Sequence, residues 1–301
     1  MKISIVVLSW NSKKYISSCL DSIKKLDSDS AQVEVVVVDN DSSDGSAAFV
    51  KKKYPRFTLI ESGSNLGYAA GNNVGIKHAL DHESDFIWIV NPDIQLQPSS
   101  LVVFLKAADR HPQAGIFTPK IYFSPGYEFH SDRYTKDELG KVIWSAGGLI
   151  DWANLITSHR GVDEVDIGQY NSDLVVDFAT GASIFLRQGV LTKVGLINPQ
   201  YYLYYEENDL CQRARKAGFK IIYVPDSVAW HANAQAAGIG STLQDYYISR
   251  NRLLFGLRWA PLRTKIALIK ESLKLLFTGR PWQRRGVLDF YLMNFGPGSY
   301  K

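Results

Sequence analysis

Short apolar runs alternate with amphipathic segments along the first hundred residues of the chain. Four of the runs predict buried strands, at residues 3–8, 33–38, 57–62 and 86–91. Apolar positions spaced three and four residues apart predict helices between them, at residues 13–26, at 47–54 and in a segment ending at Leu80. This alternation indicates an α/β fold with a Rossmann-like, mostly parallel central sheet flanked by helices.

The fourth apolar run stops at a polar tripeptide, Asn91-Pro92-Asp93. Proline has no N–H and cannot extend a strand ladder, so we expect the strand to end at Asn91. Asp93 then lies just beyond the carboxyl end of a central strand, where ligands bind in open α/β sheets. A carboxylate there suits Mg²⁺ or Mn²⁺ bridging a diphosphate, although the same tripeptide is also good turn chemistry.

The other predicted strands also end in polar loops. Ser9-Trp10-Asn11-Ser12 follows the first, an Asp- and Ser-rich stretch at 39–46 the second, and a Gly- and Asn-rich stretch at 65–73 the third. Turns and helix caps explain one such loop, whereas four at one rim of the sheet favour a nucleotide site. No Gly-x-Gly-x-x-Gly follows the first strand and no P-loop motif occurs, which disfavours hydride-transfer enzymes and P-loop nucleotidases.

The sequence is less regular beyond residue 100. The pattern predicts a helix at 101–110 and a short strand at 115–119, and then an aromatic-rich insertion or added antiparallel strands at 121–177. Two further strands, at 175–179 and 184–187, flank Gly181, where a ligand or a neighbouring backbone would come close.

An acidic cluster, Glu206-Glu207-Asn208-Asp209, precedes a helix that ends at Gly218. Acidic residues stabilise helix N-termini through the dipole, but two adjacent glutamates also suit a general base, because their ionisation states can differ. A strand at 220–224 then leads to His231. Together, Asp93 and His231 would offer one oxygen and one nitrogen ligand to Mg²⁺ or Mn²⁺, with phosphate oxygens completing the shell.

The composition fits a globular protein of 301 residues, with 46% hydrophobic and 21% charged residues. Two cysteines give no disulfide framework, so we expect a cytoplasmic protein. We expect no signal peptide and no membrane span, because the first apolar run is short and no run of 18 apolar residues occurs.

Basic residues gather at the C-terminal end, where residues 241–301 hold 11 Lys or Arg against three Asp or Glu. Within this stretch, residues 262–277 predict an amphipathic helix. Basic amphipathic helices bind membrane surfaces, but a helix packed on the domain with solvated charges explains the pattern equally well. Nucleic acid is disfavoured, since no binding motif accompanies the charge.

Taken in order, the motifs resemble the inverting glycosyltransferases of family 2, which have the GT-A fold. The resemblance covers about residues 3–232 and rests on Val38 to Ser46; Asn65-Leu66-Gly67 through Ile76; Asn91-Pro92-Asp93; Thr180-Gly181-Ala182; Glu206 to Leu210 with Arg213 and Gly218; and Trp230-His231. It implies a GT-A domain at 1–240, with a nucleotide-sugar half at 1–120 and an acceptor-binding, catalytic half at 121–240. Residues 241–301 would form a basic helical extension.

The resemblance also implies roles for individual residues. Glu207 would deprotonate the acceptor hydroxyl, and Asp93 and His231 would hold the metal. Donor binding would fall to Ser9, Asn11, Asp39, Asn65, Gly67, Asn73 and Asn91, and acceptor binding to Gly181, Glu206 and Asp209.

Two positions depart from the family pattern. The metal motif usually has two aspartates, but its first position here is Asn91, whose amide oxygen is a weaker ligand. The base is usually an aspartate that follows a glutamate, but here it is Glu207, whose side chain reaches about one methylene further. These departures leave open a nucleotide-sugar-binding protein without turnover.

Within the family, Asn-Pro-Asp and the loop from Asn65 to Asn73 are similar to rhamnosyltransferase-like members. That similarity implies transfer of L-rhamnose from dTDP-rhamnose to a glycan or polyprenyl-linked acceptor in cell-surface polysaccharide synthesis. The protein would then work in the cytoplasm or on the inner face of the cell membrane. A UDP-hexose donor and a nucleotidyltransferase reaction remain alternatives.

Overall fold

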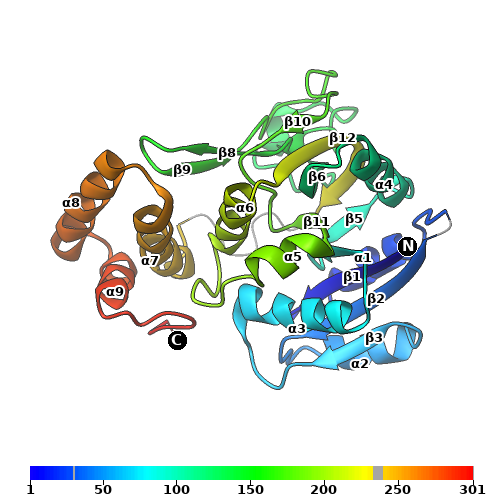
Figure 1. The fold of residues 1–301 in the computed structure, drawn as a ribbon, viewed down its shortest axis with the longest axis horizontal. Coiled ribbons are helices and arrows are strands. Elements are labelled where there is room, and N and C mark those ends of the chain that lie inside the picture. Colours follow the sequence, from blue (N-terminus) through cyan, green and yellow to red (C-terminus); the bar gives the residue numbers. More distant parts are fainter. Residues whose placement is uncertain (30, 233–239, 301) are drawn as a thin grey trace.

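A central sheet with helices on both faces organises the molecule (Figure 1). The computed structural model describes residues 1–29, 31–232 and 240–300. Eight strands of the sheet follow one another in the spatial order β10 (Leu174–Val175), β12 (Lys220–His231), β6 (Ala114–Phe123), β11 (Ser183–Arg187), β4 (Phe86–Val90), β1 (Lys2–Ser9), β2 (Gln32–Asp39) and β3 (Thr58–Glu61). Two more strands lie off this order: β5 (Ile94–Leu96) pairs with β12, and β7 (Ile143–Ser145) pairs with β6.

The parallel half of the sheet, β1 to β4, confirms the predicted strand–helix units. Alternate residues of β1 face opposite layers of helices. Ile5 and Val7 pack in the core under α1 (Ile16–Ile23), α2 (Ser46–Lys53) and α4 (Ser100–Arg110). Val6 and Leu8 pack in the core under α3 (Gly67–Asp81), α5 (Gln188–Val194) and α6 (Glu206–Lys216). Because both faces are covered, β1, β2 and β4 each contain four or five consecutive apolar residues instead of an alternating pattern.

The second half of the sheet differs in detail from the sequence prediction. β11 runs antiparallel to both β4 and β6, and β6 extends to Phe123, well beyond the predicted end. The prediction of a strand at 175–179 was wrong, because regular pairing there is confined to Leu174–Val175. The strand expected at 220–224 is longer than predicted: β12 continues past Pro225 to His231, with an irregularity between Val224 and Val228.

Residues 121–177 contain the added antiparallel strands that were one of two expectations. β8 (Gly148–Asp151) and β9 (Ile156–His159) form a two-stranded arm that leaves the main sheet. In Figure 1 this arm extends over α6 toward the C-terminal helices. The hydroxyl of Thr264 donates to the carbonyl of Trp152 at 2.9 Å, so the tip of the arm is tied to those helices.

The C-terminal extension is helical, as expected. It consists of α7 (Thr242–Trp259), α8 (Leu262–Thr278) and α9 (Pro281–Tyr291), stacked at one end of the molecule (Figure 1). α9 was not predicted. None of the helices in the described ranges is both long and apolar enough to cross a membrane.

Candidate active site

A cavity of about 600 Å³ opens where the parallel strands end. Five of the residues expected to bind the donor or its metal line this donor cavity: Asn11, Asn65, Gly67, Asn91 and Asp93. The loops after β1 and β2 are joined by hydrogen bonds: the amide of Ser43 donates to Asn11 Oδ1 at 2.8 Å, and that of Asn40 donates to the Ser9 carbonyl at 2.7 Å. Polar loops that are separate in sequence therefore form one rim, as in other open α/β sheets.

Two expected donor residues, Ser9 and Asp39, are buried at this rim and are not among the lining residues. Ser9 is hydrogen-bonded to the Ser12 hydroxyl at 2.7 Å. Asp39 Oδ2 accepts from the amide of Ser42 at 3.0 Å, but Asp39 Oδ1 is buried without a hydrogen-bond partner among the described residues. An unpartnered buried carboxylate oxygen is costly, so a donor group on a ligand would stabilise this site.

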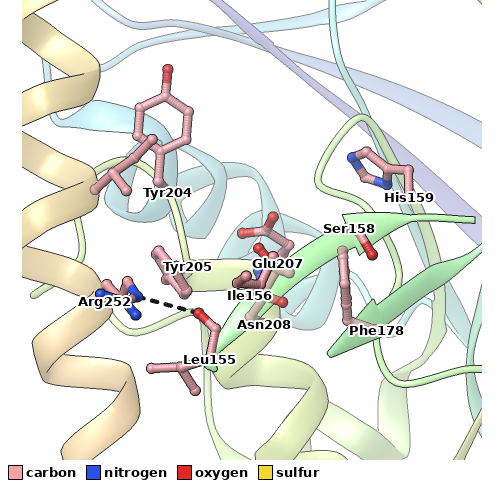
Figure 2. A pocket seen from close by; sticks show the side chains of 12 residues that line it. Leu155, Ile156, Ser158, His159, Phe178, Tyr204, Tyr205, Glu207, Asn208 and Arg252 are labelled. Atoms are coloured by element: carbon pink, nitrogen blue, oxygen red, sulfur yellow. Dashed lines mark hydrogen bonds between the residues drawn. The ribbon is translucent and has the colours of Figure 1, made fainter. Parts of the chain in front are cut away.

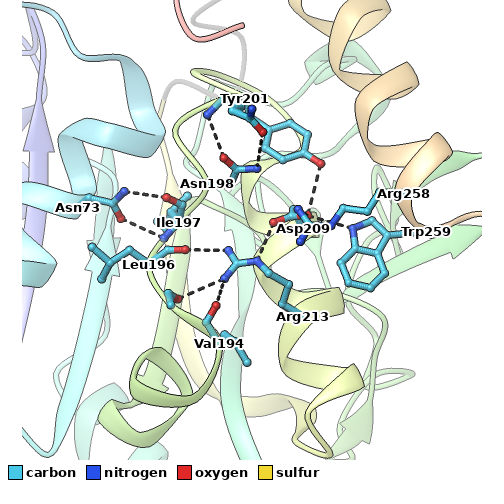
Figure 3. Close-up of polar contacts among 12 residues, drawn as sticks. Asn73, Val194, Leu196, Ile197, Asn198, Tyr201, Asp209, Arg213, Arg258 and Trp259 are labelled. Carbon is cyan, nitrogen blue, oxygen red and sulfur yellow. Dashed lines mark hydrogen bonds and ion pairs between the residues drawn. The ribbon is translucent and has the colours of Figure 1, made fainter. Parts of the chain in front are cut away.

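Asn73 is not among the residues that line the donor cavity. Its amide donates to the Ile197 carbonyl at 2.7 Å and its oxygen accepts from the Ile197 amide at 3.0 Å, as Figure 3 shows. These two bonds reproduce a backbone pairing between α3 and the segment after α5. The structure therefore gives Asn73 a scaffolding role, not the donor contact expected from the sequence.

Asp93 and His231 meet, as the sequence led us to expect. His231 Nε2 lies 3.2 Å from Asp93 Oδ2, and both side chains are nearly buried. Asp93 Oδ1 and His231 Nδ1 have no hydrogen-bond partner among the described residues. The carboxylate and imidazole fit a divalent metal, but the described residues contain no cluster of three or more such ligands. A metal held here would need ligand oxygens from elsewhere, such as a diphosphate.

A loop of tyrosines at residues 201–205 runs between the donor cavity and a second one. Tyr202, Tyr204 and Tyr205 all have left-handed backbones, with φ of 64°, 69° and 73°. This conformation costs about 1–3 kcal/mol for each non-glycine residue, so the surrounding contacts must hold it. Because the backbone turns so sharply, Tyr202 and Leu203 line the donor cavity whereas Tyr204 and Tyr205 line the other.

The second cavity, of about 380 Å³, contains Glu207. Figure 2 shows Glu207 beside Tyr205, facing the β9 arm, with Arg252 of α7 at the opposite side. Arg252 donates to the carbonyl of Leu155 at 3.3 Å and pairs with Glu271 at 2.9 Å. The C-terminal extension therefore forms part of this cavity, which the sequence did not indicate.

The adjacent glutamates are buried at the start of α6. Burial raises the pKa of Glu207 to about 7. Burial, and then the charge of Glu207, raise the pKa of Glu206 well above its ordinary value. One carboxylate oxygen of each side chain has no hydrogen-bond partner among the described residues. Two adjacent buried carboxylates cannot both ionise easily, so the raised pKa values favour a pair that carries at most one negative charge.

Tyr68 was not singled out from the sequence, although it lies within a recognised motif. It lines the donor cavity, and its hydroxyl donates to the carbonyl of Gly181. Burial, Glu206 and Glu207, in that order, raise the pKa of Tyr68. The close neighbour of Gly181 is therefore the hydroxyl end of the Tyr68 side chain, whereas the sequence led us to expect a ligand or a neighbouring backbone.

Asp209 is fully buried and lines neither cavity. Figure 3 shows its carboxylate surrounded by donors: Arg213 Nε at 2.8 Å, Trp259 Nε1 at 2.9 Å and Arg258 Nη1 at 3.3 Å. Arg213 continues to the carbonyls of Val194 and Leu196. This placement does not support the acceptor contact expected of Asp209, which instead joins α6 to α5 and to the end of α7.

The profile of glycosyl transferase family 2 matches residues 4–159, more than half of the chain. The chain is a family 2 glycosyltransferase. It is 28% identical over 214 residues to the N-acetylglucosaminyl-diphospho-decaprenol L-rhamnosyltransferase of Mycobacterium tuberculosis, a match that spans 68% of each chain. It is 24% identical over 238 residues to the rhamnosyltransferase WbbL of Escherichia coli, which spans 76% of this glycosyltransferase and 81% of WbbL.

Solved structures support the GT-A fold of this glycosyltransferase. Staphylococcus aureus TarS superposes with a TM-score of 0.56 at 20% identity, covering 93% of this chain but only 44% of TarS. A mannosyltransferase from Pyrobaculum calidifontis, solved with GDP-Man and Mn²⁺, gives a TM-score of 0.56 at 17% identity and covers 97% of this chain and 74% of the mannosyltransferase. The glycosyltransferase thus shares the fold of both over nearly its whole described length.

The Asp209 cluster generates a stability prediction. Asp209→Ala leaves the nearly buried guanidinium of Arg213 without its carboxylate, so we expect a loss of about 3–5 kcal/mol in the free energy of unfolding. Asp109→Ala, at an exposed position of α4, serves as the control and should change stability by less than about 0.5 kcal/mol. Urea denaturation measures both. If Asp209→Ala is as stable as the wild type but needs more acceptor, Asp209 binds acceptor after all.

Proposed function

We propose that this glycosyltransferase moves a sugar from a nucleoside diphosphate donor to a glycan or lipid-linked acceptor, with inversion at the anomeric carbon. The observation that carries the proposal is the pair of cavities separated by the tyrosine loop. Asp93, paired with His231, lines one cavity, and Glu207, with a pKa of about 7, lines the other. This arrangement allows a leaving group and a proton acceptor to be on opposite sides of the reacting carbon.

On the donor side, the rim formed by Asn11 and Asn65 would hold the nucleoside, and Asn91 and Asp93 would lie toward the diphosphate. Asp93 and His231 would hold Mg²⁺ or Mn²⁺, together with diphosphate oxygens. When bound, the metal would neutralise the charge that develops on the leaving diphosphate. The single-aspartate motif leaves Asp93 as the only carboxylate ligand from this tripeptide.

On the acceptor side, Glu207 would accept the proton of the acceptor hydroxyl as its oxygen attacks the anomeric carbon. The bond from that carbon to the diphosphate oxygen breaks in the same displacement, so the product is inverted and a nucleoside diphosphate leaves. The raised pKa of Glu206 beside it favours the neutral form of that side chain, which would carry no competing charge. The buried setting keeps the pKa of Glu207 near neutrality, where a general base is most effective.

We infer that the transferred sugar is L-rhamnose, with dTDP-rhamnose as the donor. Two of the relatives are rhamnosyltransferases, and the donor cavity has apolar walls that suit the methyl group of a 6-deoxy sugar: Leu8, Trp10, Tyr15, Tyr202, Leu203 and Tyr247. A UDP-hexose is the rival donor, since TarS has been solved with UDP-GlcNAc and shares the fold.

We also propose that α8 rests on the membrane surface, where a lipid-linked acceptor would be found. Its outer face carries five apolar side chains that are between 40% and 78% exposed: Leu262, Ile266, Ile269, Leu273 and Phe277. Exposed basic residues flank this face at Arg263, Lys270 and Lys274. An apolar stripe bordered by positive charge complements an anionic lipid surface.

The first test is a thermal-shift panel of dTDP, UDP and GDP with and without Mn²⁺. At a hundred times its Kd, a bound nucleotide adds about 2.7 kcal/mol to the free energy of unfolding. We expect dTDP to stabilise most, and mainly with Mn²⁺. Asp93→Asn should abolish the metal-dependent part, whereas Asp109→Asn, far from the cavity, should retain it. Stabilisation by UDP alone would identify the rival donor, and no shift with any nucleotide would contradict the proposal.

Glu207→Gln tests the general base. We expect kcat to fall by about 10²–10⁴-fold, while the isosteric Glu206→Gln, which mimics the protonated neighbour, should be far milder. In the wild type, kcat should rise with pH up to about 7, since the base works only after losing its proton. The kcat of Glu207→Gln should not show this rise with pH. Equal transfer by Glu207→Gln and the wild type would exclude Glu207 as the base.

Liposome co-sedimentation tests α8. We expect binding to anionic vesicles at low salt, weaker binding to neutral vesicles, and loss of binding in Leu273→Glu with Phe277→Glu. Ile167→Glu is the matched control, because Ile167 is 86% exposed but lies outside the extension. A wild-type protein that stays in the supernatant with anionic vesicles would exclude this docking surface.

A further inference from the structure

Two buried polar side chains of the C-terminal extension line neither cavity of the proposed reaction. Arg250 and Asn251 lie next to each other on α7, and both are fully buried. A buried guanidinium is costly unless its donors are satisfied. Burial accordingly lowers the pKa of Arg250. The partners of these two residues therefore show what the side chains are for.

The partners are backbone carbonyls of the tyrosine loop. Asn251 Nδ2 contacts three of them, those of Tyr201 and Leu203 at 2.8 Å and of Tyr204 at 2.9 Å. Arg250 Nη2 donates to the Tyr201 carbonyl at 2.9 Å and to that of Gln200 at 3.2 Å. Arg250 Nε also donates to Asn251 Oδ1 at 2.9 Å, which fixes the amide so that its nitrogen faces the loop.

The loop needs such contacts because of its backbone. The left-handed residues Tyr202, Tyr204 and Tyr205 prevent its carbonyls from pairing in a helix or a strand. On its other side, the Tyr202 carbonyl accepts from the amides of Tyr68 and Ala69 at 2.8 and 3.2 Å. The ring of Tyr202 stacks on Tyr247 of α7, with centroids 5.2 Å apart. The loop is thus held between α3 and the extension.

Displacement of this loop would disturb both cavities at once. Tyr202 and Leu203 form a wall of the donor cavity, Tyr204 and Tyr205 form a wall of the second cavity, and Glu206 follows directly. We propose that Arg250 and Asn251 are positioning residues for sugar transfer, because they clamp the strained loop that leads directly into Glu206 and Glu207. This inference rests on the proposed function of Glu207.

Asn251→Asp tests the clamp. The variant keeps the size of the side chain and the oxygen that accepts from Arg250, but it places a second oxygen, in place of the donor nitrogen, against three carbonyls. Misplacement of reacting groups by about 1 Å costs about 10²-fold in rate, so we expect kcat to fall by about that factor. The Kd for dTDP with Mn²⁺, which depends on the polar rim, should change less than about threefold. Arg250→Lys, which keeps the charge but loses the planar fork, should show the same split to a smaller degree.

Ser272→Ala is the matched control. Ser272 is buried in the same extension and its hydroxyl donates to the Ile269 carbonyl at 2.8 Å, so the variant loses a buried hydrogen bond without touching the loop. It should keep wild-type kcat. Limited digestion with chymotrypsin, which cuts after tyrosine, adds a readout of the loop itself. We expect faster cleavage at residues 201–205 in Asn251→Asp than in the wild type or Ser272→Ala.

The outcomes separate the inference from the proposed function. If Glu207→Gln is inactive but folded Asn251→Asp and Arg250→Lys retain wild-type kcat and resist chymotrypsin, the clamp is refuted alone. The clamp is also refuted if these variants lose activity only in proportion to the fraction of protein that is unfolded, because kcat per folded molecule is then unchanged. If the wild type transfers no sugar, the proposed function fails, and chymotrypsin alone then decides whether the clamp holds the loop. If Asn251→Asp does not fold, Arg250→Lys supports the same comparison.

Discussion

Two adjacent carboxylates taken out of water impose the main constraint on this structure. Glu206 and Glu207 each keep one oxygen without a hydrogen-bond partner in the part of the chain that the structure describes, and burial raises the pKa of both. Such a pair is unfavourable for folding. When the pKa of a carboxyl group is higher in the folded than in the unfolded state, the free energy of unfolding falls as pH rises from the unfolded-state pKa to the folded-state pKa. For Glu207 that range runs from about 4.5 to about 7. The surrounding loop, helix and extension must therefore hold the pair in place against this cost.

The sequence predicted the parts of the site that depend on local chemistry. Asn91-Pro92-Asp93 ends a strand because proline cannot pair, and His231 reaches Asp93 because their strands end at the same rim. Asn73 and Asp209 were assigned as ligand contacts from their motifs, but their partners are Ile197 and Arg213. The residue type does not reveal whether a polar side chain faces a ligand or the scaffold, because that depends on tertiary packing.

The largest omission was the C-terminal extension. Its sequence showed a basic amphipathic pattern, which describes only the outer surface of α8. The residues that matter inside, Arg250, Asn251 and Tyr247, contact a loop about 50 residues earlier in the chain. No local period encodes contacts of that separation. The family profile ends at residue 159 and does not cover the extension.

The glycine at position 67 has a consequence for building hybrid enzymes. Gly67 has a φ of 73°, and a Cβ there would overlap the ring of Tyr202. The tyrosine ring therefore occupies space that only a glycine leaves free. Residues 65–73 were expected to form a loop, but from Gly67 onward they are the first turns of α3. A chimera that takes residues 65–73 from one relative and the 201–205 loop from another would bring together surfaces shaped for different neighbours. The two segments form one unit of exchange, although more than a hundred residues separate them.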